Sequence, residues 1–159
     1  MTGVQTCALP ISPALVRWTL DRTRGRLTER VLDDHGGDFP RFDDRVGGQN
    51  YRYAYTSHWG DGVGFFFGPA YKTDVRSERT EVHDFGPGHA SSEPVFVPRN
   101  GATGEDDGYV MCYVFDAQRN SSDVAILSAQ DFTGQPLAVV ELPVRVLFNF
   151  HGNWVPDRQ

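Results

Sequence analysis

The sequence predicts an all-β protein, and two observations support that prediction. No window of the 159 residues shows a sustained helical period, of about 3.6 residues, with capping residues at both ends. Short segments of strand length recur instead, rich in β-branched and aromatic residues and bounded by turns that contain Gly or Asp. The aromatic residues, 11 Phe, 6 Tyr and 3 Trp, are numerous enough to fill a hydrophobic core.

The expected strands begin with residues 15–20 (LVRWTL), which a turn at 21–25 connects to a second strand at 26–32. Residues 51–56 (YRYAYT) alternate aromatic with small or polar side chains, as in a half-buried strand. Residues 109–115 (YVMCYVF) form a continuous apolar run, for which we expect burial on both faces. The other candidate strands are residues 63–67, 71–73, 80–85, 123–128 and 137–142.

Three segments repeat one pattern: a strand, a turn opened by Asp, and a second strand of alternating character. They are residues 16–32, 70–85 and 125–142, and their turns contain Asp21, Asp74 and Asp131. The aspartates lie 53 residues (74 − 21) and 57 residues (131 − 74) apart, which is the size of a propeller blade of about four strands. Because propellers close with about four to eight blades, three units indicate a partial β-propeller with open apolar faces. A β-sandwich with a similar number of strands is the alternative.

Composition and charge exclude several classes of protein. The formal net charge is −6, and no basic face stands out, so nucleic acid is not an expected partner. Cys7 and Cys112 provide neither a disulfide framework nor zinc-ligand spacing, which favours a reducing, cytoplasmic location. No apolar run reaches the length of a transmembrane segment. The sequence does not indicate an oligomeric state.

Residues 1–11 (MTGVQTCALPI) stand apart from the rest of the chain. The string resembles the translation of a common DNA-sequencing adapter. It therefore predicts a non-native segment at 1–11, a propeller-like domain at 12–159, and a native gene interrupted upstream of Ser12. An ordinary disordered N-terminus is the alternative. The segment lacks the basic and apolar regions of a signal peptide.

Spacing alone identifies no active site. The five histidines form no HxH or HxxxH pair, and no GxSxG motif occurs; they are His35, His58, His83, His89 and His151. Taken singly, each is more often a core or surface residue than a metal ligand. Taken singly in the same way, Asp38 is interpreted as a turn residue and Glu93 as a surface carboxylate at a strand end.

Four motifs nevertheless occur in a specific order. They are residues 38–43 (DFPRFD) with 51–53 (YRY), 92–99 (SEPVFVPR), 105–109 (EDDGY) and 150–156 (FHGNWVP). In this order they resemble the C-terminal third of the carotenoid cleavage oxygenases, a family that includes apocarotenoid oxygenases, retinoid isomerase and lignostilbene dioxygenases. The resemblance spans nearly all of residues 12–159 and implies about three blades of a seven-bladed propeller.

The resemblance also implies a metal site. In the family, four histidines from different blades hold one non-haem Fe(II) per full-length chain. Residues 150–152 (FHG) match the last of these, so His151 is an expected iron ligand, and the other three would lie upstream. Ligating histidines usually donate their second N–H to a carboxylate. The family pattern assigns that role to Glu93 and to Asp38, which is one methylene shorter than the glutamate usually found there.

The implied reaction is oxidative cleavage of a conjugated C=C bond in an apolar polyene or a stilbene, with O₂ and without an organic cofactor. With one of four ligands, the 159-residue chain itself is expected to be inactive. The alternative function is a non-catalytic propeller or sandwich module that binds a partner through its loops.

Overall fold

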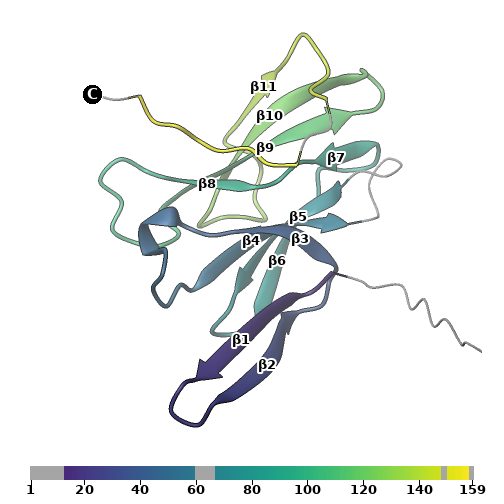
Figure 1. The fold of residues 1–159 in the computed structure, drawn as a ribbon. Coiled ribbons are helices and arrows are strands. Elements are labelled where there is room, and N and C mark those ends of the chain that lie inside the picture. The colour runs from purple at the N-terminus through teal and green to yellow at the C-terminus, as the bar shows by residue number, and fades with distance from the viewer. Residues whose placement is uncertain (1–12, 60–66, 148–149, 158–159) are drawn as a thin grey trace, which may run out of the picture.

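A computed structural model of the chain describes residues 13–59, 67–147 and 150–157. Those residues contain eleven strands and one short 3₁₀ helix, so the all-β prediction is confirmed for them. The strands form antiparallel sheets that follow one another along the chain (Figure 1). No described helix has the length and apolar character needed to cross a membrane. The predicted boundary after residue 11 and most of the predicted strand 63–67 fall outside the described residues.

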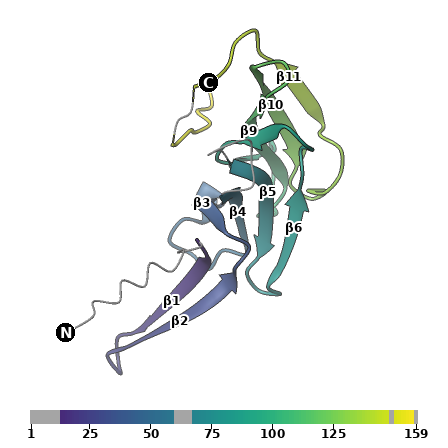
Figure 2. The same cartoon turned by 90° about the vertical axis from the view of Figure 1, so that its right-hand side faces the viewer.

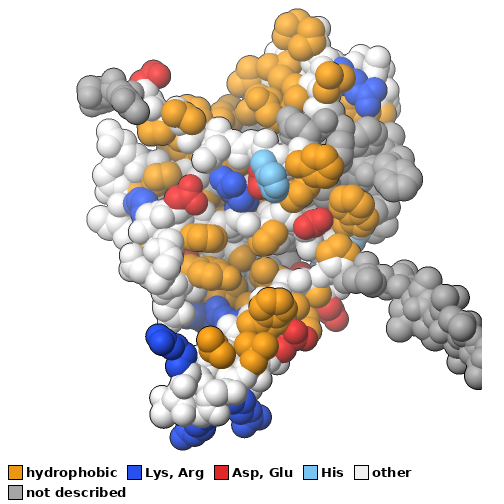
Figure 3. All heavy atoms as spheres, in the orientation of Figure 1, with side chains coloured by type: hydrophobic (Ala, Val, Ile, Leu, Met, Phe, Trp, Pro, Cys, Tyr) orange, Lys and Arg blue, Asp and Glu red, His pale blue; other side chains and the backbone are white. Residues whose placement is uncertain are grey.

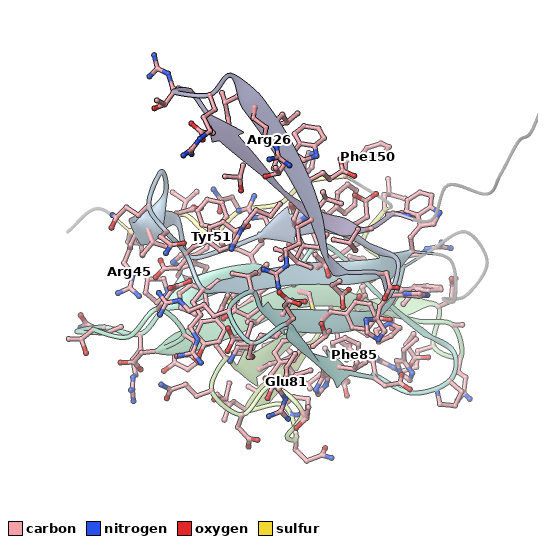
Figure 4. All side chains as sticks on the ribbon, turned by 90° about the horizontal axis from the view of Figure 1, so that it is seen from below. Arg26, Arg45, Tyr51, Glu81, Phe85 and Phe150 are labelled. Carbon is pink, nitrogen blue, oxygen red and sulfur yellow. The ribbon has the colours of Figure 1, made fainter. Side chains whose placement is uncertain are left out.

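The first sheet is a two-stranded hairpin of β1 (Leu15–Asp21) and β2 (Arg26–Asp33). The second is a four-stranded meander of β3 (Gly37–Arg41), β4 (Tyr53–Trp59), β5 (Phe67–Asp74) and β6 (Arg79–His83). The 3₁₀ helix η1 (Asp44–Val46) lies between β3 and β4. Figure 4 shows the hairpin, which carries Arg26, projecting away from the other sheets.

The third sheet contains β7 (His89–Ser91), β8 (Val95–Pro98), β9 (Gly108–Asp116), β10 (Ser121–Ser128) and β11 (Ala138–Glu141). Both β7 and β8 pair with the same side of β9, at opposite ends of it. They therefore act as one broken edge strand, and the sheet is a four-stranded meander like the second. The sequence did not predict β3, β7 or β8, because each is short and lies among turn-forming residues.

The hairpin turns correct part of the predicted repeat. Asp21, Asp74 and Asp116 each accept hydrogen bonds from the backbone N–H groups two and three residues later. The residue four positions after each aspartate has positive φ: Gly25 at 59°, Glu78 at 57° and Asn120 at 50°. The third repeat of this turn is thus opened by Asp116, between β9 and β10, and not by Asp131. Asp131 lies in the longer loop from β10 to β11.

The second and third sheets pack face to face over the main hydrophobic cluster (Figure 2). The rings of Tyr55 and Phe96, one from each sheet, stack with centroids 5.7 Å apart and planes 9° apart. We call this set the interblade cluster; it consists of Tyr55, Ala70, Phe96, Val110, Leu127, Ala129 and Phe132. Burial along β9 alternates, and Tyr113 is 40% exposed. The prediction that 109–115 is buried on both faces was therefore wrong, because only one face of this sheet is covered.

Polar contacts reinforce the same interface. Lys72 of β5 is buried, and its Nζ donates to the Ala129 carbonyl at 2.5 Å and to Asp106 Oδ2 at 3.0 Å. Glu105 Oε1 accepts from the backbone N–H groups of Arg52 and Tyr53. The acidic motif 105–109 therefore ties the loop before β9 to the second sheet. A buried ammonium group satisfied in this way does not carry the desolvation penalty of an unpaired charge.

Large apolar side chains are exposed at both ends of the described part of the molecule, as expected for open blade faces. Trp18 and Leu20 on the hairpin are 69% and 65% exposed. Val139 of β11, at the other end, is 52% exposed. Figure 3 shows hydrophobic side chains over both the hairpin and the β10–β11 region.

Truncation of the interblade cluster should destabilise the fold far more than truncation of the hairpin surface. Leu127 is 1% exposed, so Leu127→Ala should lower the free energy of unfolding by about 2–5 kcal/mol through lost burial and a cavity. The matched control is Leu27→Ala on β2, where the side chain is 60% exposed and a change within about 0.5 kcal/mol is expected. Urea unfolding followed by tryptophan fluorescence measures both, and equal losses would contradict the assigned core.

Candidate functional site

Glu93 occupies the break between β7 and β8. Ser92 still pairs with β9 through its backbone N–H, which donates to the Tyr113 carbonyl at 2.8 Å. Pro94, two residues after Ser92, has no N–H to continue the ladder and is fully buried. Pairing with β9 is therefore interrupted at Glu93 and Pro94, and the Glu93 side chain, only 5% exposed, turns toward the C-terminal segment.

The Glu93 carboxylate is the centre of a compact polar cluster. Its Oε2 accepts a hydrogen bond from the Gly152 N–H at 2.8 Å. Its Oε1 lies 3.2 Å from His151 Nδ1 and 3.6 Å from Arg41 Nη1. A buried carboxylate is costly unless donors surround it, and here a backbone amide, an imidazole and a guanidinium do so.

His151 lies in an irregular segment, residues 150–157, and its side chain is 70% exposed. An ionised carboxylate can only accept hydrogen bonds, so the contact with Glu93 places a proton on Nδ1. The lone pair of Nε2 is then the one available for a metal ion or another donor. The Phe39 ring packs edge-on against the imidazole, with centroids 5.1 Å apart. The structure thus brings together the predicted pair His151 and Glu93, while the ligand role of His151 stays a prediction.

Asp38, the other predicted carboxylate, has a different environment. Its Oδ1 accepts from the Phe39 N–H at 2.7 Å, and the structure records no contact between Asp38 and His151. Asp38 lies where β3 carries one extra residue relative to β4, because Asp38 pairs with Ser57 but Arg41 with Tyr55. Its short side chain bonds the backbone of the next residue, an arrangement typical of Asp in turns and bulges. A supporting role for Asp38 at a metal site stays a prediction.

The other four histidines are not part of the Glu93 cluster. His35 Nδ1 lies 2.5 Å from Asp33 Oδ1, and His83 Nδ1 lies 3.0 Å from the Phe132 carbonyl. His89 Nδ1 lies 3.2 Å from the Pro87 carbonyl, and His58 packs against the Tyr71 ring. Within the described ranges, no group of three or more His, Cys, Asp or Glu side chains could hold a metal ion. The described residues therefore fit one imidazole ligand with its supporting carboxylate, and not a complete metal centre.

A pocket of about 430 Å³ opens beside the cluster. Its polar part includes Ser92, Glu93, His151 and Asn153, and its apolar walls come from Val95, Met111, Cys112, Tyr113, Val124 and Trp154. Burial raises the pKa of the Cys112 thiol to about 12, so the thiol is neutral at physiological pH and is no nucleophile. Sequence reasoning missed Arg41 and Asn153 as parts of this site, although both lie inside quoted motifs.

Comparison with known proteins identifies one family for nearly the whole chain. Residues 3–156 match the family described as retinal pigment epithelial membrane protein. A carotenoid cleavage oxygenase of Mycobacterium tuberculosis is 37% identical over 151 residues, which cover 91% of this chain and 29% of that protein. An apocarotenoid-15,15'-oxygenase of Synechocystis is 30% identical, covering 88% of this chain and 29% of the relative. The resveratrol cleavage oxygenase 1 of Aspergillus fumigatus is 32% identical, covering 93% and 33%.

The fold matches the same group. The crystal structure of cobalt-substituted Synechocystis apocarotenoid oxygenase superposes with a TM-score of 0.84 at 28% identity, covering 91% of this chain and 30% of that one. This likeness confirms the partial propeller predicted from the sequence over the β-sandwich alternative. The chain spans about 29% of the length of the first curated relatives.

Loss of the Glu93 charge should release the C-terminal segment. In Glu93→Gln, the contacts with Gly152, His151 and Arg41 lose their ionic component, so cleavage by chymotrypsin after Phe150 and Trp154 should accelerate about tenfold, the effect of one charge-assisted hydrogen bond. Asp38→Asn is the matched control and should leave the rate unchanged, since Asp38 bonds the N–H of the adjacent Phe39 and not the C-terminal segment. Mass spectrometry of the released peptides gives both rates. Equal acceleration in the two variants would contradict the role assigned to Glu93.

The buried thiol should resist alkylation. In a Cys7→Ser background, Cys112 should react with iodoacetamide far more slowly in the native chain than in urea. At each pH from about 7 to 9 the native rate should stay far below the rate in urea, because the raised pKa keeps the thiolate fraction small. In urea the rate should rise with pH as an ordinary thiol ionises. Native and unfolded rates that coincide at each pH would show that Cys112 is accessible.

Proposed function

Because the chain belongs to the carotenoid cleavage oxygenase family, which is known for iron-dependent oxygenases, we propose that it forms part of a dioxygenase that cleaves a conjugated C=C bond with O₂. The observation that carries the proposal is the pairing of His151 Nδ1 with the buried Glu93 carboxylate at 3.2 Å. That pairing leaves Nε2 as the metal-binding nitrogen and holds the ring in one orientation.

The proposed substrates are apolar polyenes or stilbenes. The relatives are named for carotenoid, apocarotenoid and resveratrol cleavage, and these compounds all contain conjugated double bonds. The largely apolar walls of the pocket beside His151 support an apolar ligand, although neighbouring strands of any propeller would also supply such side chains. The products would be two carbonyl compounds, with both oxygen atoms supplied by O₂.

We assign His151 as one of four imidazole ligands of a single Fe(II) per full-length chain. Imidazole nitrogen suits Fe(II), and the bound iron would supply the activation of O₂. Glu93 would orient the His151 ring and increase the basicity of its Nε2 by accepting the Nδ1 proton. Gly152 would keep Glu93 in place through its N–H. Asp38 is proposed to support a second imidazole, contributed by a part of the protein outside this chain.

The 159-residue chain on its own is proposed to bind iron weakly and to be inactive. The described residues offer one imidazole backed by a carboxylate, and one imidazole does not define a coordination geometry. The cytoplasmic location predicted from the sequence stays a prediction.

The decisive variant is His151→Ala in a longer protein that includes the remaining blades. The parent should contain about one iron per chain, as expected for a single mononuclear site, and should consume O₂ with a carotenoid, an apocarotenoid or a stilbene. His151→Ala should lose the iron and the turnover while keeping its far-UV circular dichroism. The control is His89→Ala, which removes a partly exposed imidazole outside the cluster and should keep both.

Elemental analysis and an oxygen electrode provide the two readouts. An iron-containing, active His151→Ala protein would overturn the assigned ligand. A parent that binds no iron would favour the non-catalytic binding module instead.

A further inference from the structure

We infer that Arg41 is a positioning residue for His151: its guanidinium joins Glu93 to Asn153 and so fixes the segment that presents the imidazole. The purpose of this arrangement rests on the proposed function, in which His151 is a metal ligand. The geometry itself does not depend on a bound metal.

Arg41 uses two different nitrogens for two different parts of the chain. Its Nη2 donates to Asn153 Oδ1 at 2.9 Å. Its Nη1 lies 3.6 Å from Glu93 Oε1, an ion-pair distance that is longer than a hydrogen bond. A planar guanidinium can hold both contacts at once, whereas the point charge of a lysine ammonium could satisfy only one of them well.

The three residues come from three separate elements. Arg41 is the last residue of β3, directly after the bulge, and Glu93 lies in the break between β7 and β8. Asn153 belongs to the terminal segment, 112 positions after Arg41. The bridge therefore joins the edge strands of both four-stranded sheets to a segment that has no regular structure of its own (Figure 1).

The bridge is shielded from solvent on its inner side. The side chains of Arg41 and Glu93 are 22% and 5% exposed. Ion pairs on an open surface contribute little, but a pair with one buried partner is screened less and is costly to break on one side. Glu93 already bonds the Gly152 amide and the His151 ring, so the positive charge of Arg41 balances a carboxylate that the site needs.

The consequence for His151 follows from the order of contacts along the chain. Glu93 holds residues 151 and 152, and Arg41 holds residue 153. Asn153 Oδ1 also accepts from the Trp154 N–H at 3.0 Å, which fixes the orientation of its amide. The His151 imidazole is 70% exposed and lies on an irregular segment. The contacts to residues 152 and 153 nevertheless fix the backbone on its C-terminal side.

If Arg41 stabilised the fold as a whole, its removal would also destabilise the core. The two large sheets are held together by the interblade cluster and by Lys72, none of which involves Arg41. Removal of Arg41 should therefore loosen residues 151–154 and leave the core unchanged.

The test uses the metal-free 159-residue chain labelled with ¹⁵N, so its result does not depend on iron. At one mildly alkaline pH, NMR reports the tautomer of His151 and the water exchange of the Gly152 amide. Arg41→Met should accelerate that exchange at least about tenfold and convert a single Nδ1–H tautomer into a mixture. Arg41→Lys and Asn153→Ala should give intermediate shifts, because each keeps part of the bridge.

Arg30→Met is the matched control, since Arg30 pairs with Glu78 on the exposed hairpin side of the molecule. It should leave Gly152 and His151 unchanged, and the amides of Val110 and Leu127 should stay protected in every variant. The inference is overturned if Arg41→Met leaves Gly152 and His151 as in the parent, or if core amides lose protection equally. If Arg41→Met does not fold, Arg41→Lys and Asn153→Ala decide by the same criteria. A longer protein that binds no iron would refute the proposed function and leave these readouts unaffected.

Discussion

The buried carboxylate of Glu93 is the constraint on which the site depends. A carboxylate that is 5% exposed must be surrounded by donors, and the donors available are His151, Gly152 and Arg41. The donors are an imidazole, a backbone amide and a guanidinium. Because all three bind one carboxylate, they hold the His151 ring, the C-terminal segment and the neighbouring strand β3 together. Without that charge, residues 150–154 would keep the Arg41–Asn153 hydrogen bond and aromatic contacts such as Phe39 with Phe150.

The carboxylate can occupy this place because the first strand of its sheet is interrupted. Pro94 ends the pairing of β7 with β9, and pairing resumes at Val95. The first strand of the preceding sheet is irregular at the equivalent place, where Phe39 has a φ of 52° and precedes Pro40. In both sheets an acidic residue, Asp38 or Glu93, lies at the irregularity. Bulges and breaks of this kind redirect side chains away from the ladder, and such positions are common beside functional sites.

The packing of the two four-stranded sheets brings these irregular strands close together. Stacking of Tyr55 on Phe96 and burial of Leu127 join the sheets in their middle. The acidic loop at 105–107 and Lys72 stabilise the same interface through hydrogen bonds and an ion pair. The fold and the site therefore depend on different interactions. Apolar burial holds the two sheets together, and the Glu93 charge cluster forms at the edge strands that this packing brings close.

Much of the architecture was determined by the sequence alone. Local alternation and turn chemistry identified most of the longer strands, and the motifs identified the family, with Glu93 and Asp38 as candidate partners of a ligating histidine. Local pattern failed where tertiary contacts decide: β3, β7 and β8 exist because β4 and β9 provide partners, and the repeating turn is opened by Asp116 rather than Asp131. Only the tertiary structure placed Glu93 against a histidine 58 positions away, joined Arg41 to Asn153 and left Asp38 bonded to the Phe39 N–H. The physical reason is that strand pairing and charge burial join residues distant in sequence, whereas periodicity and turn propensity report only on neighbours along the chain.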